Sequence, residues 1–148
     1  MKSLALAVLL VALLVSHTAA QMAVIVHRDN PTRDLSVDAL RRLYLGQTTT
    51  FSNGERVALV ECTPLQKSFY EKALGMLPEL VHRHWIGLVF QGEGATPPQP
   101  MHDAEATKRF VTEHPGAIGF VELRAVDATV RVVTIGGRSP SDATYPLR

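Results

Sequence analysis

The fold is decided by a strand-to-helix junction, Val57-Ala-Leu-Val-Glu-Cys-Thr-Pro-Leu-Gln-Lys67. It opens with an apolar run typical of a short buried strand. Thr63 is a good helix N-cap, Pro64 suits the first helical position, and Gln66 stands where a capping box requires Glu or Gln. The stretch therefore predicts a strand and, directly after it, a helix that runs to about residue 74.

The rest of the chain continues this alternation of apolar strands and amphipathic helices. We predict strands over 22–27, 117–121 and 130–135, helices over 37–45, from Pro78 onward and over 104–113, and an exposed loop over 91–100. In the helix that starts at Pro78, an apolar stripe is expected to face the core; it consists of Leu77, Leu80, Val81, His84, Trp85 and Leu88. Such an alternation predicts an α/β domain in which helices flank a mixed sheet with some parallel strands.

The N-terminus has the pattern of a secretion signal. Met1-Lys2 is a short basic start, an unbroken apolar run extends from Leu4 to Val15, and Thr18-Ala-Ala20 offers small residues for cleavage. As a helix the apolar run covers about 18 Å, less than the ~30 Å hydrocarbon layer of a bilayer. We expect a periplasmic or secreted protein with no membrane span after cleavage.

The domain organisation follows from this signal and from the composition of the C-terminus. We predict a signal peptide over 1–20 and one α/β domain over 21–138. The last residues, 139–148, contain Ser, Pro and polar residues and are expected to form a flexible tail.

Composition excludes several classes of function. The formal charge of the 148 residues is +1, so no strong field attracts nucleic acid or an anionic membrane. The single cysteine, Cys62, excludes an internal disulfide and a thiolate zinc cluster. We expect Cys62 to be a buried structural thiol, with a reactive or partner-linked thiol as the alternative. No nucleophile elbow, phosphate loop or dinucleotide fingerprint is present. We therefore predict that the protein is not an enzyme and that it binds no cofactor.

The histidines do not predict a metal site. His82 and His84 are the densest pair, but residues two apart on a helix point about 200° away from each other around the axis. We expect His84 to lie on the core stripe and His82 to face solvent.

The junction after residue 60 is the best candidate for a ligand site. Ligands of α/β sheets bind beyond the carboxyl ends of strands, where helix N-termini carry a partial positive charge that suits anions. Thr63 and Gln66 would hold a small oxyanion, assisted by Lys67 or Arg28. The alternative is that Thr63 and Gln66 only cap their own helix. Glu61 opposes anion binding unless it accepts a proton from the ligand or from a neighbouring group.

Three segments carry a family resemblance: Ala23-Val-Ile-Val-His-Arg-Asp-Asn-Pro31, Leu35-Ser-Val-Asp-Ala-Leu-Arg-Arg-Leu-Tyr-Leu-Gly46 and Pro115-Gly-Ala-Ile-Gly-Phe-Val121. With these segments the chain resembles short, single-domain forms of the phosphate-type periplasmic solute-binding proteins of ABC importers. The resemblance implies a single-lobe, type 2 periplasmic-binding-protein fold, phosphate or a similar oxyanion as ligand, and an ABC permease as a partner.

The chain departs from that family at the phosphate loop. The family's Gly-Ser-Gly-Thr-Arg type loop falls on residues 62–66, where Pro64 and Leu65 replace Gly and Thr and Gln66 replaces the Arg. A neutral amide thus stands in place of a bidentate cation. Residues 21–148 also amount to about half of a two-lobed clamshell. The alternative function is therefore a degenerate interaction module that binds an envelope protein and no solute.

Overall fold

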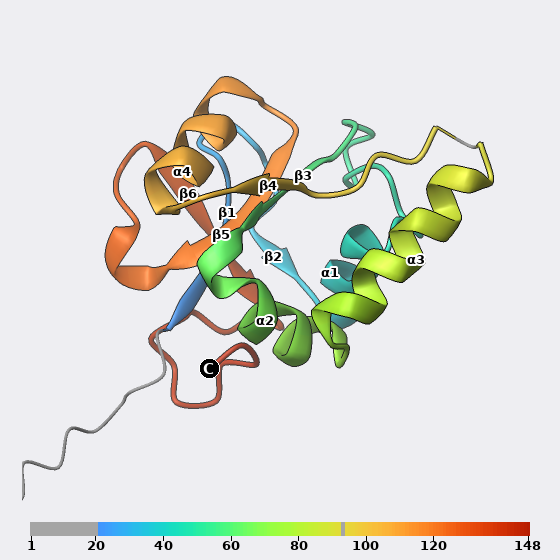
Figure 1. The fold of residues 1–148 in the computed structure, drawn as a ribbon. Helices are drawn as coiled ribbons and strands as arrows, with labels where there is room; N and C mark the ends of the chain where they lie inside the picture. Colours follow the sequence, from blue (N-terminus) through green and yellow to red (C-terminus); the bar gives the residue numbers. More distant parts are fainter. Residues whose placement is uncertain (1–20, 93) are drawn as a thin grey trace, which may run out of the picture.

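The computed structural model describes residues 21–92 and 94–148, so the predicted signal peptide lies outside the described residues. Six strands form one mixed sheet: β1 (Met22–His27), β2 (Asp34–Leu35), β3 (Ala58–Cys62), β4 (Gln99–Met101), β5 (Ala117–Glu122) and β6 (Val130–Ile135). Their order across the sheet is β2-β6-β1-β5-β3-β4 (Figure 1). The prediction of an α/β domain with a mixed sheet is confirmed.

Helices flank this sheet. The α-helices are α1 (Val37–Tyr44), α2 (Gln66–Phe69), α3 (Pro78–Phe90) and α4 (Ala104–Glu113). The 3-10 helices are η1 (Thr63–Leu65) and η3 (Leu123–Ala125), and η2 (Tyr70–Leu74) is a π-helical turn. Because η1, α2 and η2 follow one another without a break, the predicted helix over 63–74 is confirmed. Within the described part of the chain, no helix is long and apolar enough to cross a membrane.

Strand direction determines which loops meet. β1 is antiparallel to both of its neighbours, β5 and β6, whereas β3 is parallel to β5 and to β4. The carboxyl ends of β3, β4 and β5 therefore lie at the same end of the strands, referred to below as one edge of the sheet, and β1 ends at the opposite edge.

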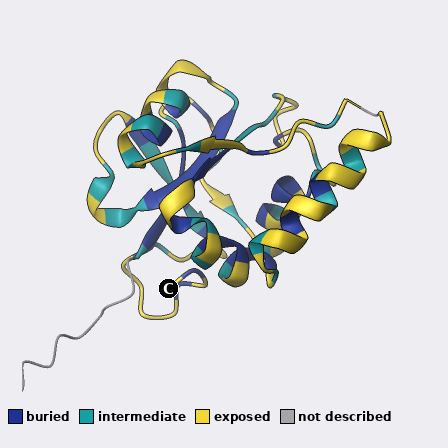
Figure 2. Cartoon of the chain, in the orientation of Figure 1, coloured by how far each residue is buried: buried dark blue, intermediate teal, exposed yellow. Residues whose placement is uncertain are grey.

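The core lies on both faces of the sheet. Side chains alternate along β1, so that Val24 and Val26 join one apolar cluster and Ile25 joins the other. The larger cluster packs against α1, the segment η1–η2 and α3, and the smaller one packs against α4. Figure 2 shows the buried residues concentrated in the central strands, while the outer side of α3 is exposed.

Two parts of the chain differ from the sequence-based expectations. The predicted loop over 91–100 contributes part of the edge strand β4, in which Pro100 has no N–H to offer a further strand. In α3 only Val81 and Trp85 are buried. Leu77 and Leu80 are 49% and 44% exposed, so the predicted core stripe is wrong at these two positions. α3 packs against η2 and the end of α1 rather than over the strands, so less core is available to it than its pattern suggests.

The C-terminal segment also needs a correction. Tyr145 and Leu147 belong to the larger apolar cluster and are 3% and 0% exposed. The expectation of a flexible tail over 139–148 overlooked these two side chains, whose burial fixes the segment against the sheet.

Candidate functional site

Glu61 is the centre of a polar cluster at the carboxyl edge of β3. It is 5% exposed, and its carboxylate accepts a hydrogen bond from Nε2 of Gln66 at 2.8 Å and another from the hydroxyl of Tyr70. Gln66 and Tyr70 are four residues apart in the helical segment, so both side chains reach the same side of it. Glu61 forms no ion pair with any described residue.

The tyrosines near Glu61 are held in their protonated, donating form. Burial raises the pKa of Tyr70 strongly, and the hydrogen bond to Glu61 and its charge raise it further. Burial, followed by the charge of Glu61, also raises the pKa of Tyr44, whose hydroxyl contacts Val60 O at 2.9 Å. Both phenols therefore remain donors at physiological pH.

The turn after β3 is built differently from the predicted capping box. No side chain caps η1, so Thr63 does not accept the predicted bond, and the amide of Gln66 points to Glu61 instead of back to the cap. The capping box is thus wrong. Gln66 N–H donates to Thr63 O, and Pro64 has no N–H. The expected row of three free amides for an anion is therefore not present at residues 64–66, where Leu65 alone could offer its N–H.

The four predicted ligand residues do not form one cluster. Thr63 is exposed at the end of β3, and Lys67, exposed as well, pairs with Glu71 at 2.7 Å. Gln66 lies between Glu61 and His82. Arg28 follows β1 and therefore lies at the opposite edge of the sheet from Thr63. Ligand binding by Thr63, Gln66 and Lys67 remains a prediction.

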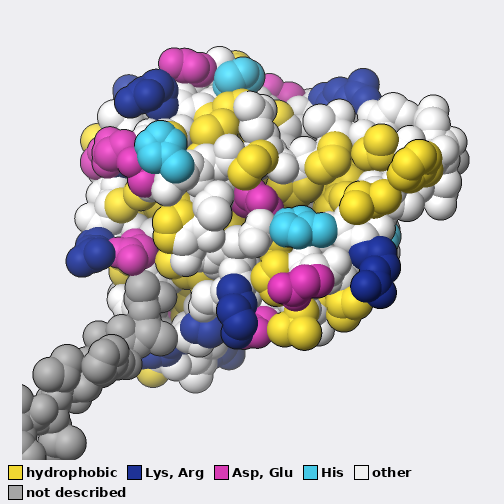
Figure 3. Space-filling view, in the orientation of Figure 1, with side chains coloured by type: hydrophobic (Ala, Val, Ile, Leu, Met, Phe, Trp, Pro, Cys, Tyr) yellow, Lys and Arg dark blue, Asp and Glu magenta, His cyan; other side chains and the backbone are white. Residues whose placement is uncertain are grey.

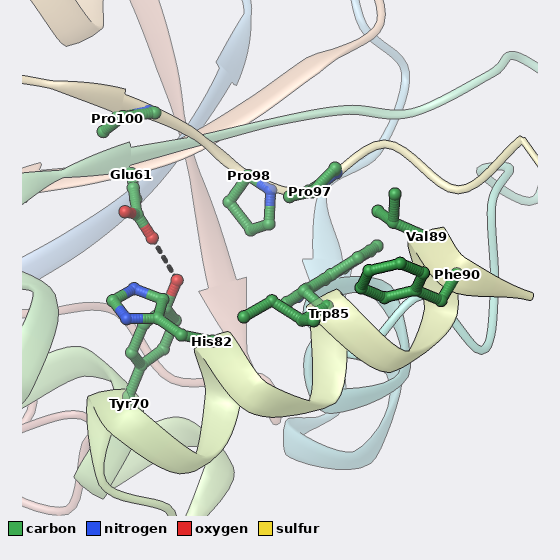
Figure 4. A pocket seen from close by; sticks show the side chains of 10 residues that line it. Glu61, Tyr70, His82, Trp85, Val89, Phe90, Pro97, Pro98 and Pro100 are labelled. Carbon is green, nitrogen blue, oxygen red and sulfur yellow. Dashed lines mark hydrogen bonds between the residues drawn. The ribbon is translucent and has the colours of Figure 1, made fainter.

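A pocket of about 400 Å³ opens beside this cluster, between α3 and the segment that enters β4 (Figure 4). Its wall from α3 carries His82, Trp85, Val89 and Phe90, and Pro97 and Pro98 face them, while Glu61 and Tyr70 close one end. The remaining lining residues are Ile86 and Pro100. One end of the pocket is polar, and the rest of its surface is apolar.

The rim of the pocket is an exposed apolar surface on α3. Ile86, Val89 and Phe90 are 57%, 49% and 87% exposed. In Figure 3 hydrophobic side chains gather along this side of the molecule, next to a histidine and acidic groups. Exposed apolar residues that adjoin one another in this way are typical of a binding surface.

His82 is exposed, as predicted, but it also has a partner. Although exposed, it lines the pocket, and its Nε2 lies 3.1 Å from Nε2 of Gln66. The amide nitrogen can only donate, so the imidazole nitrogen accepts. No group of three metal-ligating side chains occurs among the described residues.

Sequence reasoning identified Glu61 as a charge near the site but missed the pocket. The spacing of Gln66 and Tyr70 was a usable signal, because four residues on a helix place both donors on one face. Their shared partner and the approach of His82 depend on how α3 packs, for which the sequence contains no local signal.

Known proteins match this chain in structure. No protein-family model matches it, and no curated protein matches it in sequence. A Clostridium perfringens structure with bound phosphate, assigned as a phosphate ABC transporter substrate-binding protein, is 21% identical with a TM-score of 0.67, over 82% of this chain and 47% of the other. An ABC-type phosphate transport receptor from Vibrio cholerae is 18% identical with a TM-score of 0.68, over 86% and 53%.

PstS from Borrelia burgdorferi gives a similar result, with 9% identity and a TM-score of 0.61 over 82% of this chain and 49% of the other. The chain thus spans about half the length of these proteins. At such identities the likeness establishes the fold: a single-lobe domain like those of periplasmic binding proteins.

Proposed function

We propose that the protein is an exported, solute-binding-like protein that binds phosphate or a similar oxyanion in connection with ABC-type phosphate uptake. The observation that carries this proposal is the likeness in fold to a structure that holds bound phosphate. The matched structures are transport binding proteins, which supports a binding role rather than catalysis and a periplasmic or secreted location.

The turn after β3 supports an oxyanion site of limited strength. The hydroxyl of Thr63 is not used as a cap and is exposed, and Lys67, four residues later, is exposed as well, with its ammonium paired to Glu71. Glu61 adds negative charge beside them, which disfavours a fully ionised anion. Hydrogen phosphate retains a proton that it can donate to a carboxylate, whereas sulfate does not. We therefore expect a preference for phosphate over sulfate.

Titration calorimetry of the purified protein with phosphate and with sulfate tests this function. Phosphate is expected to bind more tightly than sulfate, and Thr63→Ala is expected to weaken phosphate binding. Thr112→Ala is the matched control, because that hydroxyl bonds a carbonyl of its own helix, Arg109 O, at 2.8 Å. Absence of heat with both anions, or unchanged phosphate binding by Thr63→Ala, would contradict the proposal.

A second candidate function is an interaction module for a permease or another envelope protein. The exposed apolar residues of α3 favour it: Leu77, Leu80, Ile86, Val89 and Phe90. Cross-linking in the cell envelope, with Ile86→Lys as the surface variant, separates the two functions. A cross-linked partner that is captured with or without phosphate, and that is no longer captured by Ile86→Lys, would support the interaction module.

A further inference from the structure

The polar end of the pocket on α3 is rich in hydrogen-bond acceptors. Both hydrogens of the Gln66 amide are directed to partners, Oε1 of Glu61 and Nε2 of His82. The hydroxyl hydrogen of Tyr70 is directed to Oε2 of Glu61. The carboxylate, with about four lone-pair sites, still has room for further donors. A group that enters here can donate hydrogen bonds to the carboxylate of Glu61.

The same end lacks a positive charge. Neither lysine nor arginine lines the pocket, and Glu61 has two neutral donors but no ion pair within the described chain. A carboxylate that is 5% exposed is costly to bury without a cation. A bound cation would offset that cost, whereas a bound anion would add to it.

The other end of the pocket suits an apolar body. Trp85 is fixed by its indole N–H, which donates to Tyr44 O at 3.0 Å, and Pro98 faces it across the pocket (Figure 4). Phe90, 87% exposed, extends the aromatic surface to the rim. Aromatic rings attract ammonium groups and pack against hydrocarbon. A volume of about 400 Å³ matches a small-molecule site.

We propose that this pocket binds a small organic ammonium ion with an apolar or aromatic body. The ammonium group donates to the carboxylate of Glu61, and the body lies between α3 and the proline segment, residues 97–100. This inference goes beyond the proposed oxyanion function, because it assigns a second ligand, of opposite charge, to a different part of the surface.

Three probes of similar shape and different charge test it: 2-phenylethylammonium, 2-phenylethanol and 3-phenylpropionate. In titration calorimetry of the purified protein the ammonium ion is expected to bind most tightly and the carboxylate least. Equal or tighter binding of the carboxylate would overturn the proposal, as would absence of binding by the ammonium ion. Phosphate is not among the probes, so the outcome is independent of the oxyanion proposal.

Two variants locate the site. Glu61→Gln is expected to weaken binding of the ammonium ion roughly tenfold or more and to change binding of the alcohol little. Glu113→Gln, an exposed carboxylate on α4, is the control and should change neither. Phe90→Ala should weaken binding of the ammonium ion about two- to fivefold, because the ring packs against the apolar body of the ligand. Phe90 contributes little to the core, so this variant reports on the site even if Glu61→Gln fails to fold. Unchanged affinity in Phe90→Ala, or in folded Glu61→Gln, would overturn the proposal.

Discussion

The hydroxyl of Tyr70 donates a hydrogen bond to the carboxylate of Glu61, where the pocket meets the edge of the sheet. Tyr70 is 0% exposed, so this bond is shielded from water. Tyr70→Phe keeps the ring and removes the donor, and it should lower the free energy of unfolding by about 1–3 kcal/mol. Urea denaturation followed by circular dichroism measures the change.

A double-mutant cycle with Glu61→Gln separates this bond from other effects of each substitution. A coupling of about 0.5–3 kcal/mol between the two positions is expected for groups in direct contact. Strictly additive effects would mean that the bond contributes nothing to stability.

Gly116 in the segment Pro115-Gly-Ala-Ile-Gly-Phe-Val121 is required for a close approach of two backbones. A Cβ at this position would collide with the carbonyl oxygen of Arg56. Because a carbonyl cannot rotate away as a side chain can, Gly116→Ala should destabilise the protein by about 1–3 kcal/mol or more.

Gly87 provides the opposite case for comparison. It lies in α3, and a Cβ there meets no atom within 4 Å. Gly87→Ala should stabilise the helix by roughly 0.5–1 kcal/mol, through the lower entropy of the unfolded chain. Melting temperatures of both variants test the pair, and equal shifts of both would refute the contact at Gly116.

The helix caps show how far local sequence predicts structure. Ser36 Oγ accepts from Ala39 N at 3.0 Å, as its sequence pattern predicts, whereas Thr63, with an equally good pattern, caps nothing. Ser36→Ala should therefore lower the free energy of unfolding by about 1 kcal/mol. Thr63→Ala should change it by less than about 0.5 kcal/mol. If Thr63→Ala lowered the free energy of unfolding as much as Ser36→Ala, Thr63 would act as a helix cap after all.

The physical reason for this difference is competition for the amide of Gln66. A capping box needs the side-chain oxygen of Gln66 to turn back and accept from the N–H of Thr63, but the side chain is instead directed to the buried carboxylate of Glu61, to which its Nε2 donates a charge-assisted hydrogen bond. Strands β1, β3, β5 and β6, the helix limits and the mixed sheet could be predicted, because apolar periodicity and turn residues act locally. The short edge strands β2 and β4 were not predicted, because they are defined by their pairing with β6 and β3. Glu61, His82 and α3 meet through tertiary packing, and no pattern in the sequence encodes that meeting.

Cys62 is predicted to be chemically quiet in the folded protein. It is 3% exposed, and burial is the main cause that raises the pKa of its thiol. Ellman's reagent at pH 8 should react with the native protein at least about tenfold more slowly than with the urea-unfolded chain. Equal rates would show a reactive thiol, the alternative that the sequence left open.

The pairing of Asp127 with Lys108 predicts a specific loss of stability in acid. Lys108 Nζ lies 2.7 Å from Asp127 Oδ2, and this bond, with those from Thr129, lowers the pKa of Asp127 from 3.8 to about 2. A carboxyl group whose pKa is lower in the folded than in the unfolded state stabilises the protein at any pH above its unfolded-state pKa. This contribution disappears as the pH drops from about 4 to 2. Asp127→Asn should thus lower the melting temperature at pH 6 and have a smaller effect at pH 2. Glu113→Gln serves as the exposed control. A difference between wild type and Asp127→Asn that stays constant from pH 6 to pH 2 would mean that the pair does not contribute in its ionised form.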